Sequence, residues 1–153
     1  MIGVDVGKAR VGVARCDDDA IMALPVATLR RDRWGGDVEE VAELVESLGA
    51  HRVVVGLPRL MGGSAGAAVE DAVAWARELD ELVDVPIRLL DERLTSVSAH
   101  AQLREAGRPT RTHRSIIDQQ AAVIIVEHAL ESERRTGHEA GISLDEWPTK
   151  EEE

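Results

Sequence analysis

Residues 2–14, IGVDVGKARVGVA, are the most informative stretch of this sequence for its fold. Apolar residues occupy every second position over 2–6, and a period of two predicts a β-strand. Residues 7–10 then predict a tight turn, and the same alternation resumes over 11–15. The chain is therefore expected to begin with a β-hairpin.

Downstream of the hairpin, strand-like apolar runs alternate with stretches of helical spacing. Three consecutive valines at 53–55 are typical of a strand buried on both faces, as in a parallel sheet. Pro25 predicts an edge strand or a bulge, Asp37 an N-cap, and Gly49 a helix C-terminus. The expected strands are 2–6, 11–15, 21–29, 52–57 and 85–90, and the expected helices are 38–48, 69–83, 96–106 and 115–135. This order predicts an α/β fold with a five-stranded mixed sheet flanked by helices.

The length and charge distribution predict one domain and an acidic tail. The chain has 153 residues and a formal net charge of −11, which favours a single domain over residues 1–136. Residues 138–153 carry six acids against one lysine, and we expect 137–153 to be a disordered tail. Docking of Trp147 back onto the body is the alternative.

The net charge, the aromatic content and the cysteine count exclude some classes of function. The acidic balance argues against a general polyanion binder, although it can hide a local basic patch. The aromatic residues are three tryptophans, so base stacking is poorly supplied. A single cysteine and no membrane-length apolar run predict a cytoplasmic protein with no membrane association.

Three acidic positions stand out because they lie in or beside apolar elements. Asp5 lies inside a predicted central strand, where burial is costly without a partner; the alternative is a strand that exposes it. Glu92 follows a predicted buried strand, at an edge where sites commonly lie; the alternative is a surface loop with an ion pair. Asp118 shares a helix face with apolar residues; the alternative is a capping box that begins at Ser115.

Carboxylates brought together from three elements repel one another, and a hard divalent cation relieves the repulsion. Mg²⁺ prefers a few carboxylates together with water and phosphate oxygens. Two such ions would suit phosphodiester cleavage. If the sheet gathers Asp5, Glu92 and Asp118 at one edge, they form a candidate site for Mg²⁺ or Mn²⁺.

Two further segments fit a phosphate-containing substrate. The glycine-rich residues 62–66 lead into a helix whose free amides can hold an anion, although a flexible linker explains them equally well. Arg108, Arg111 and Arg114 form a basic loop, and residues 88–114 hold six arginines against three acids. A solvated loop is the alternative explanation for these arginines.

Four ordered motifs resemble the YqgF (RuvX) family, over roughly residues 2–135. They are VDVGKARVGVA at 4–14, VVGLP at 54–58, DERLT at 91–95 and IDQQAA at 117–122. The resemblance implies a ribonuclease-H-like fold related to Holliday-junction resolvases. It also implies a nuclease that processes the 5′ end of precursor 16S ribosomal RNA.

The resemblance further implies roles for residues that match its motifs. Asp5, Glu92 and Asp118 would be the catalytic acids that bind metal. Lys8 and Arg10 would lie near the site, and Arg93 and Thr95 would support it.

Several functional alternatives stay open at this point. One is a resolvase acting on branched DNA, for which a homodimer rather than a monomer is expected. An actin-like ATPase and a non-catalytic ribosome-assembly factor are alternatives of other classes. The length disfavours the ATPase, because clamping a nucleotide in that fold takes two such lobes.

Overall fold

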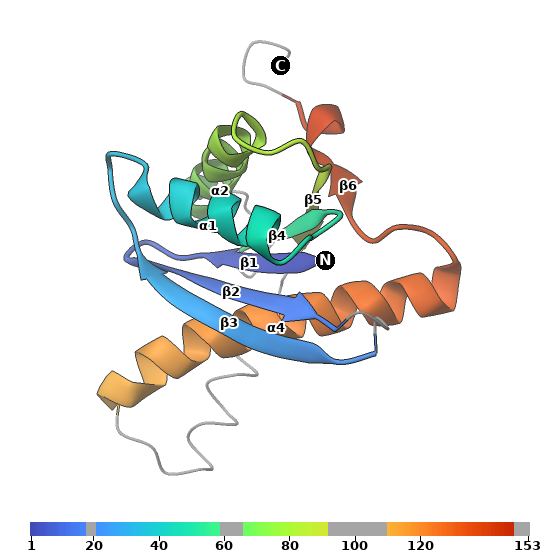
Figure 1. Cartoon of the computed structure of the whole chain (residues 1–153), viewed down its shortest axis with the longest axis horizontal. Helices are drawn as coiled ribbons and strands as arrows, with labels where there is room; N and C mark the ends of the chain where they lie inside the picture. The colour runs from blue at the N-terminus through green and yellow to red at the C-terminus, as the bar shows by residue number, and fades with distance from the viewer. Residues whose placement is uncertain (18–20, 59–65, 92–109, 149–153) are drawn as a thin grey trace.

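A computed structural model describes residues 1–17, 21–58, 66–91 and 110–148, and over 110–118 it describes the backbone alone. The strands are β1 Ile2–Val6, β2 Arg10–Cys16, β3 Ala23–Arg30, β4 Val53–Leu57, β5 Ile87–Asp91 and β6 Ile142–Ser143. The helices are α1 Gly36–Ser47, α2 Gly66–Asp80, α4 Thr110–Thr136 and the short 3-10 helix η1 Leu144–Glu146. The predicted mixed α/β sheet flanked by helices is confirmed (Figure 1).

The central strand of the sheet is β1. The strand order is β3-β2-β1-β4-β5-β6. Strand β1 pairs with β2 antiparallel and with β4 parallel, and β4 pairs with β5 parallel. The carboxyl ends of β1, β4 and β5 therefore meet at one edge of the sheet, where ligand sites of α/β proteins commonly lie.

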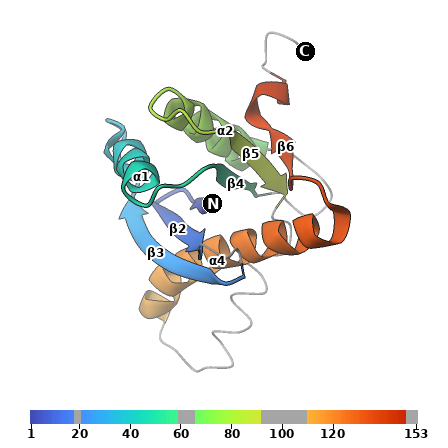
Figure 2. The ribbon, with the colours of Figure 1, turned by 45° about the vertical axis from the view of Figure 1, so that its right-hand side comes forward.

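Helices cover both faces of the sheet. Helices α1 and α2 lie on one face, and α4 crosses the other (Figures 1 and 2). The side chains of β4 supply both cores, because Val53, Val55 and Leu57 join the α1 and α2 side while Val54 packs against α4. This two-sided burial explains the run of valines that predicted a parallel strand.

Helix α4 approaches β1 closely at Gly3. A Cβ atom built on Gly3 would lie 2.5 Å from Cγ2 of Val126 and 3.3 Å from the carbonyl oxygen of Ala122. The helix runs antiparallel to β1, so its earlier turns lie toward the carboxyl end of the strand (Figure 1). Gly3 thus permits the close packing that brings the amino-terminal half of α4 toward that edge.

The structure departs from the expected disordered tail over residues 137–148. Strand β6 pairs with β5 antiparallel and becomes the sixth strand, which the sequence analysis missed. The physical reason lies partly in Arg88, whose guanidinium donates to the carbonyl oxygens of Ala140 at 2.7 Å and Gly141 at 2.6 Å. Leu144 is buried, and Trp147 packs against the core, so the alternative of a docked Trp147 is confirmed.

Two predictions about local geometry are also confirmed. Strand β3 is an edge strand, and its pairing with β2 shifts register between Val13 and Ala14, opposite Pro25. Gly49 adopts a φ of +62° directly after α1, as a helix-ending glycine does.

The predicted N-cap role of Asp37 is wrong. The N-cap of α1 is Gly35, with a φ of 84° and no side chain to cap the helix. Asp32 performs that task from outside the helix, because its carboxylate accepts from the amide of Gly36 at 3.1 Å. Asp37 is instead buried in the first turn of α1.

The helix expected over 96–106 lies outside the described residues. Where the structure describes a helix, none is both long and apolar enough to cross a membrane.

Candidate functional site

Asp5 is a buried acid at the carboxyl end of the central strand. Its exposed fraction is 8%, so the alternative of a strand that exposes it is wrong. Alternation along β1 puts Asp5 on the same face as Gly3, which contacts α4. Asp5 thus lies where β1, α4 and the open edge of the sheet meet.

The last residues of β5 alternate in the direction of their side chains. Leu90 packs against the cluster that α4 forms with β4. Asp91 pairs with Leu57 in the parallel register, and it is exposed at the end of the strand. By alternation Asp91 belongs to the α1 and α2 face rather than the face of Asp5.

Asp118 belongs to α4, one turn before Ala122. The helix begins at Thr110, so Ser115 is an interior residue. The capping box proposed as the alternative role of Asp118 is therefore wrong, because that motif requires Ser115 at the N-cap. Since Ala122 contacts Gly3 and α4 runs antiparallel to β1, the turn that contains Asp118 lies toward the Asp5 end of β1.

The remaining predicted residues differ in how much the structure describes. Lys8 is exposed in the β1–β2 turn, and Arg10 is half-buried at the start of β2. Arg111 and Arg114 lie in the first turns of α4, so the predicted basic loop over 108–113 is helical from Thr110 onward. Glu92, Arg93, Thr95, Arg108 and the glycine-rich residues 62–65 lie outside the described residues.

An arginine-centred network supports the turn that follows Asp5. The guanidinium of Arg31 donates to the carbonyl oxygen of Gly7 at 2.8 Å. Its two Nη atoms also bind both carboxylate oxygens of Asp71 on α2, at 2.7 and 2.9 Å. This paired hydrogen bond holds the pKa of the Asp71 carboxyl below its ordinary value and raises that of Arg31.

A buried acid extends the same network into the core. Asp37 lies 3.5 Å from Nε of Arg31 and accepts a hydrogen bond of 2.9 Å from Nε1 of Trp75. This network was not predictable from local sequence, because its bonded pairs lie up to 40 residues apart. The signal available in the sequence was Asp37 at the start of an amphipathic helix. A helix cap explained that position as well as a buried network did.

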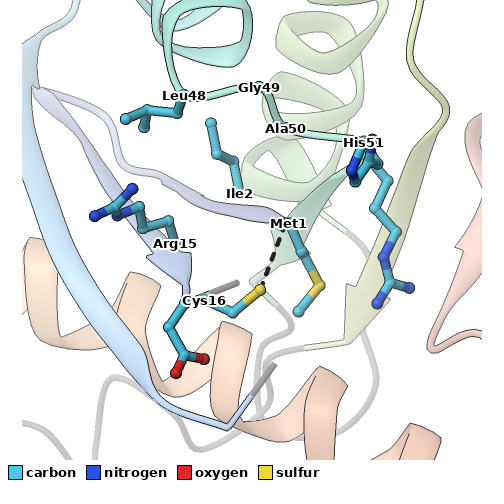
Figure 3. Close-up of a pocket in the computed structure, with 10 residues that line it drawn as sticks. Met1, Ile2, Arg15, Cys16, Leu48, Gly49, Ala50 and His51 are labelled. Carbon is cyan, nitrogen blue, oxygen red and sulfur yellow. Dashed lines mark hydrogen bonds between the residues drawn. The ribbon is translucent and has the colours of Figure 1, made fainter. Parts of the chain in front are cut away.

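A separate cavity of about 240 Å³ lies at the opposite edge of the sheet. Its lining includes Met1, Arg15, Cys16 and His51 (Figure 3). Among the described side chains, no group of three His, Cys, Asp or Glu is placed to hold a metal ion. Of the three predicted metal-binding acids, Asp5 is the one whose side chain is described.

Comparisons with known proteins converge on one family. A family model for RuvX, described as a Holliday junction resolvase, matches residues 1–132. A Clavibacter michiganensis relative named "Putative pre-16S rRNA nuclease" is 45% identical over 141 residues, covering 92% of this chain and 88% of the relative. A Mycobacteroides abscessus relative of the same name is 48% identical over 140 residues, covering 90% and 84%.

The fold also matches solved structures. Thermus thermophilus RuvC in complex with a Holliday junction substrate aligns with a TM-score of 0.56 at 15% identity, covering 94% of this chain and 99% of that one. A second T. thermophilus RuvC structure gives a TM-score of 0.54 at 17% identity, covering 92% and 99%. At these identities the likeness concerns the ribonuclease-H-like fold.

Proposed function

The chain belongs to the RuvX family, and from that membership we propose that it is a metal-dependent nuclease. Its proposed reaction is phosphodiester hydrolysis at the 5′ end of precursor 16S ribosomal RNA, the substrate class named for its relatives. The observation that carries the proposal is the buried carboxylate of Asp5 at the carboxyl edge of the sheet. Residues 1–136 are proposed as the nuclease domain.

Asp5, Glu92 and Asp118 are the proposed ligands of Mg²⁺ or Mn²⁺. The fit rests on their chemistry, since carboxylate oxygens are the donors that these hard cations prefer. The position of Asp118 on α4 supports its inclusion. The alternation along β5 supports Glu92 as the third ligand. Leu90 lies on the α4 face and Asp91 on the opposite face, so Glu92 is the next position expected on the α4 face.

When bound, the metal would lower the pKa of a coordinated water and stabilise charge on the phosphate. The residues of the chain have separate tasks. Asp5 provides a fixed, largely desolvated carboxylate whose orientation depends on the packing of β1 against α4. Lys8 and Arg10 are proposed to bind phosphate oxygens of the substrate beside the turn.

The basic residues near the start of α4 and beyond β5 extend the proposed substrate contact. Arg93, Arg108, Arg111 and Arg114 are proposed to bind the phosphate backbone, with Thr95 supporting the site. Because the net charge is −11, we expect weak non-specific binding and a shallow dependence of RNA affinity on salt. Cytoplasmic location and a monomeric or homodimeric state stay predictions.

Cleavage of Holliday junctions is the second candidate, favoured by the printed description of the matching family model. The two candidates separate in one assay with Mg²⁺, using a 5′-extended fragment of 16S precursor RNA and a four-way DNA junction. Faster cleavage of the RNA supports the proposed function, whereas cleavage of the junction alone replaces it with the second candidate. Tight RNA binding with no cleavage in Mg²⁺ or Mn²⁺ would instead support a non-catalytic assembly factor.

A further inference from the structure

Trp34 is the most exposed of the three tryptophans of this chain. The sequence contains three tryptophans and no phenylalanine or tyrosine, and all three tryptophans lie within the described residues. Trp75 is 1% exposed and Trp147 packs against the core, whereas Trp34 is 82% exposed. The molecule thus presents its most exposed indole ring in the connection between β3 and α1.

An ordered turn holds Trp34 in that position. The carboxylate of Asp32 accepts hydrogen bonds from the amides of Trp34 at 3.0 Å and Gly36 at 3.1 Å. Gly35 completes the turn with a φ of 84°, and its amide donates to the carbonyl oxygen of Asp32 at 2.9 Å. The indole is therefore presented by a constrained backbone, which lowers the entropy cost of binding through it.

The start of the β3–α1 connection, at Arg31, is bonded to the turn that follows Asp5. The amide of Arg31 donates to the carbonyl oxygen of Ala9 at 2.9 Å, and its guanidinium donates to that of Gly7 at 2.8 Å. Both bonds fasten the β3–α1 connection to the β1–β2 turn, which begins two residues after Asp5. In Figure 1 both connections lie at the left end of the sheet, and the β3–α1 connection rises from there toward α1, on the face opposite α4.

Basic side chains lie near Trp34, together with the carboxylate of Asp32 under the turn. The guanidinium of Arg33 lies over the indole, 5.4 Å from the ring centroid. Arg30 is exposed at the end of β3 and pairs in register with Arg10, next to the exposed Lys8. An aromatic face flanked by arginine and lysine is the arrangement that single-stranded nucleic acids recognise, by base stacking and phosphate contact.

We propose that Trp34 is a stacking platform for an unpaired base of the nucleic-acid substrate, with Arg33 and Lys8 contacting the adjoining phosphates. This inference rests on the proposed nuclease function and adds a requirement to it: the substrate has a single-stranded segment beside the cleavage site. Within an RNA duplex the bases stack on one another, so that only the two terminal base pairs offer an outer face to the indole.

The test measures binding of a single-stranded RNA 12-mer and of a blunt RNA duplex of the same length, in EDTA so that neither is cut. Wild type is compared with Trp34→Ala, Trp34→Phe and a control, Leu82→Ala, which removes a distant side chain that is 52% exposed. We expect Trp34→Ala to raise the Kd for the single strand at least about fivefold. Trp34→Phe recovers part of that loss, and Leu82→Ala matches wild type. The Kd for the duplex changes little in every variant.

Fluorescence supplies a second readout. Stacking should quench the emission of wild type on addition of the single strand, and Trp34→Phe should abolish the quench. Equal Kd values for wild type and Trp34→Ala, or a quench that persists in Trp34→Phe, overturn the inference even if the protein cuts RNA. A quench that depends on Trp34 in a protein that cuts no nucleic acid supports the platform and refutes the nuclease. Absence of nucleic-acid binding by wild type overturns both.

Discussion

The guanidinium of Arg31 donates a hydrogen bond of 2.8 Å to the carbonyl oxygen of Gly7, at the turn that follows the central strand. The same guanidinium is fixed by Asp71 and lies beside the buried Asp37. A residue 24 positions away in the sequence thus anchors the backbone just beyond Asp5.

Replacement of this arginine should impair catalysis through the position of the turn. Arg31→Met removes the bond to Gly7 and leaves Asp37 without its cationic neighbour. On the proposal that Asp5 binds metal, we expect the cleavage rate to fall about 10- to 100-fold, the loss typical when a group that positions a metal ligand is removed, and the Mg²⁺ concentration for half-maximal activity to rise. Arg134→Met, an exposed arginine in the last turn of α4, is the control. A wild-type rate in Arg31→Met would contradict this role.

The contact between Gly3 and α4 predicts a specific steric conflict. Gly3→Ala places a methyl group 2.5 Å from Cγ2 of Val126, and overpacking of this kind costs about 1 to 3 kcal/mol of unfolding free energy. Val126→Ala should make room for that methyl group. In urea denaturation, the two changes should therefore show a favourable coupling of at least about 0.5 kcal/mol. Additive losses would indicate that the helix does not approach β1 at this point.

The pairing of Arg52 with Glu133 predicts a pH dependence of stability. Both Nη atoms of Arg52 bind the carboxylate of Glu133, and this pairing holds the pKa of that carboxyl below its ordinary value. A lowered carboxyl pKa in the folded state stabilises the fold above the unfolded pKa. That stability is lost as the pH falls through the folded pKa.

Glu133→Gln should therefore cost about 1 to 3 kcal/mol at pH 7, and the difference from wild type should shrink below about pH 4.5, the ordinary glutamate value. The measurement is urea denaturation at a series of pH values. Glu131→Gln, an exposed acid on the same helix, is the matched control. A difference that does not change with pH would rule out the ion pair as its source.

Adjacent acids at the end of β5 should differ sharply in function. Glu92→Gln should reduce the cleavage rate by on the order of 100-fold or more, because it removes a proposed metal ligand. Asp91→Asn should have a much smaller effect, since its side chain belongs to the opposite face of the sheet. The measurement is the cleavage rate of each variant at saturating Mg²⁺. A larger loss in Asp91→Asn than in Glu92→Gln would show that Asp91 is the ligand.

The elements that local pattern specifies were predictable from the sequence. Consecutive valines in β4 indicate a strand with apolar side chains on both faces, and Pro25 in β3 indicates an edge strand or a bulge. Each of these features can be inferred from the residues of its own strand. Strand β6 was missed because it has only two residues and lies within an acidic stretch. The carbonyl groups just before it are held by Arg88 of β5, which is far away in the sequence.

The candidate site was predictable in part for similar reasons. Asp5 is unusual within its own strand, so the sequence alone identified it. Asp37 resembled a helix cap, and its contact with Trp75 depends on how α1 packs against α2. The exposure of Trp34 likewise depends on a turn built by Asp32 and Gly35, which no periodicity reveals. Glu92 and Asp118 were singled out by a strand end and an apolar helix face, each with an equally good structural explanation, and the motifs of the family then favoured them as partners of Asp5.

The most direct test of the central claim compares wild type with Asp5→Asn on 5′-extended precursor 16S RNA in the presence of Mg²⁺. The substitution keeps the size of the side chain and removes the charge that a divalent cation requires. The account predicts cleavage by wild type and a rate lower by on the order of 100-fold or more for Asp5→Asn, in a variant that still unfolds cooperatively on heating. Equal cleavage by the two proteins, or no cleavage by wild type, would contradict it.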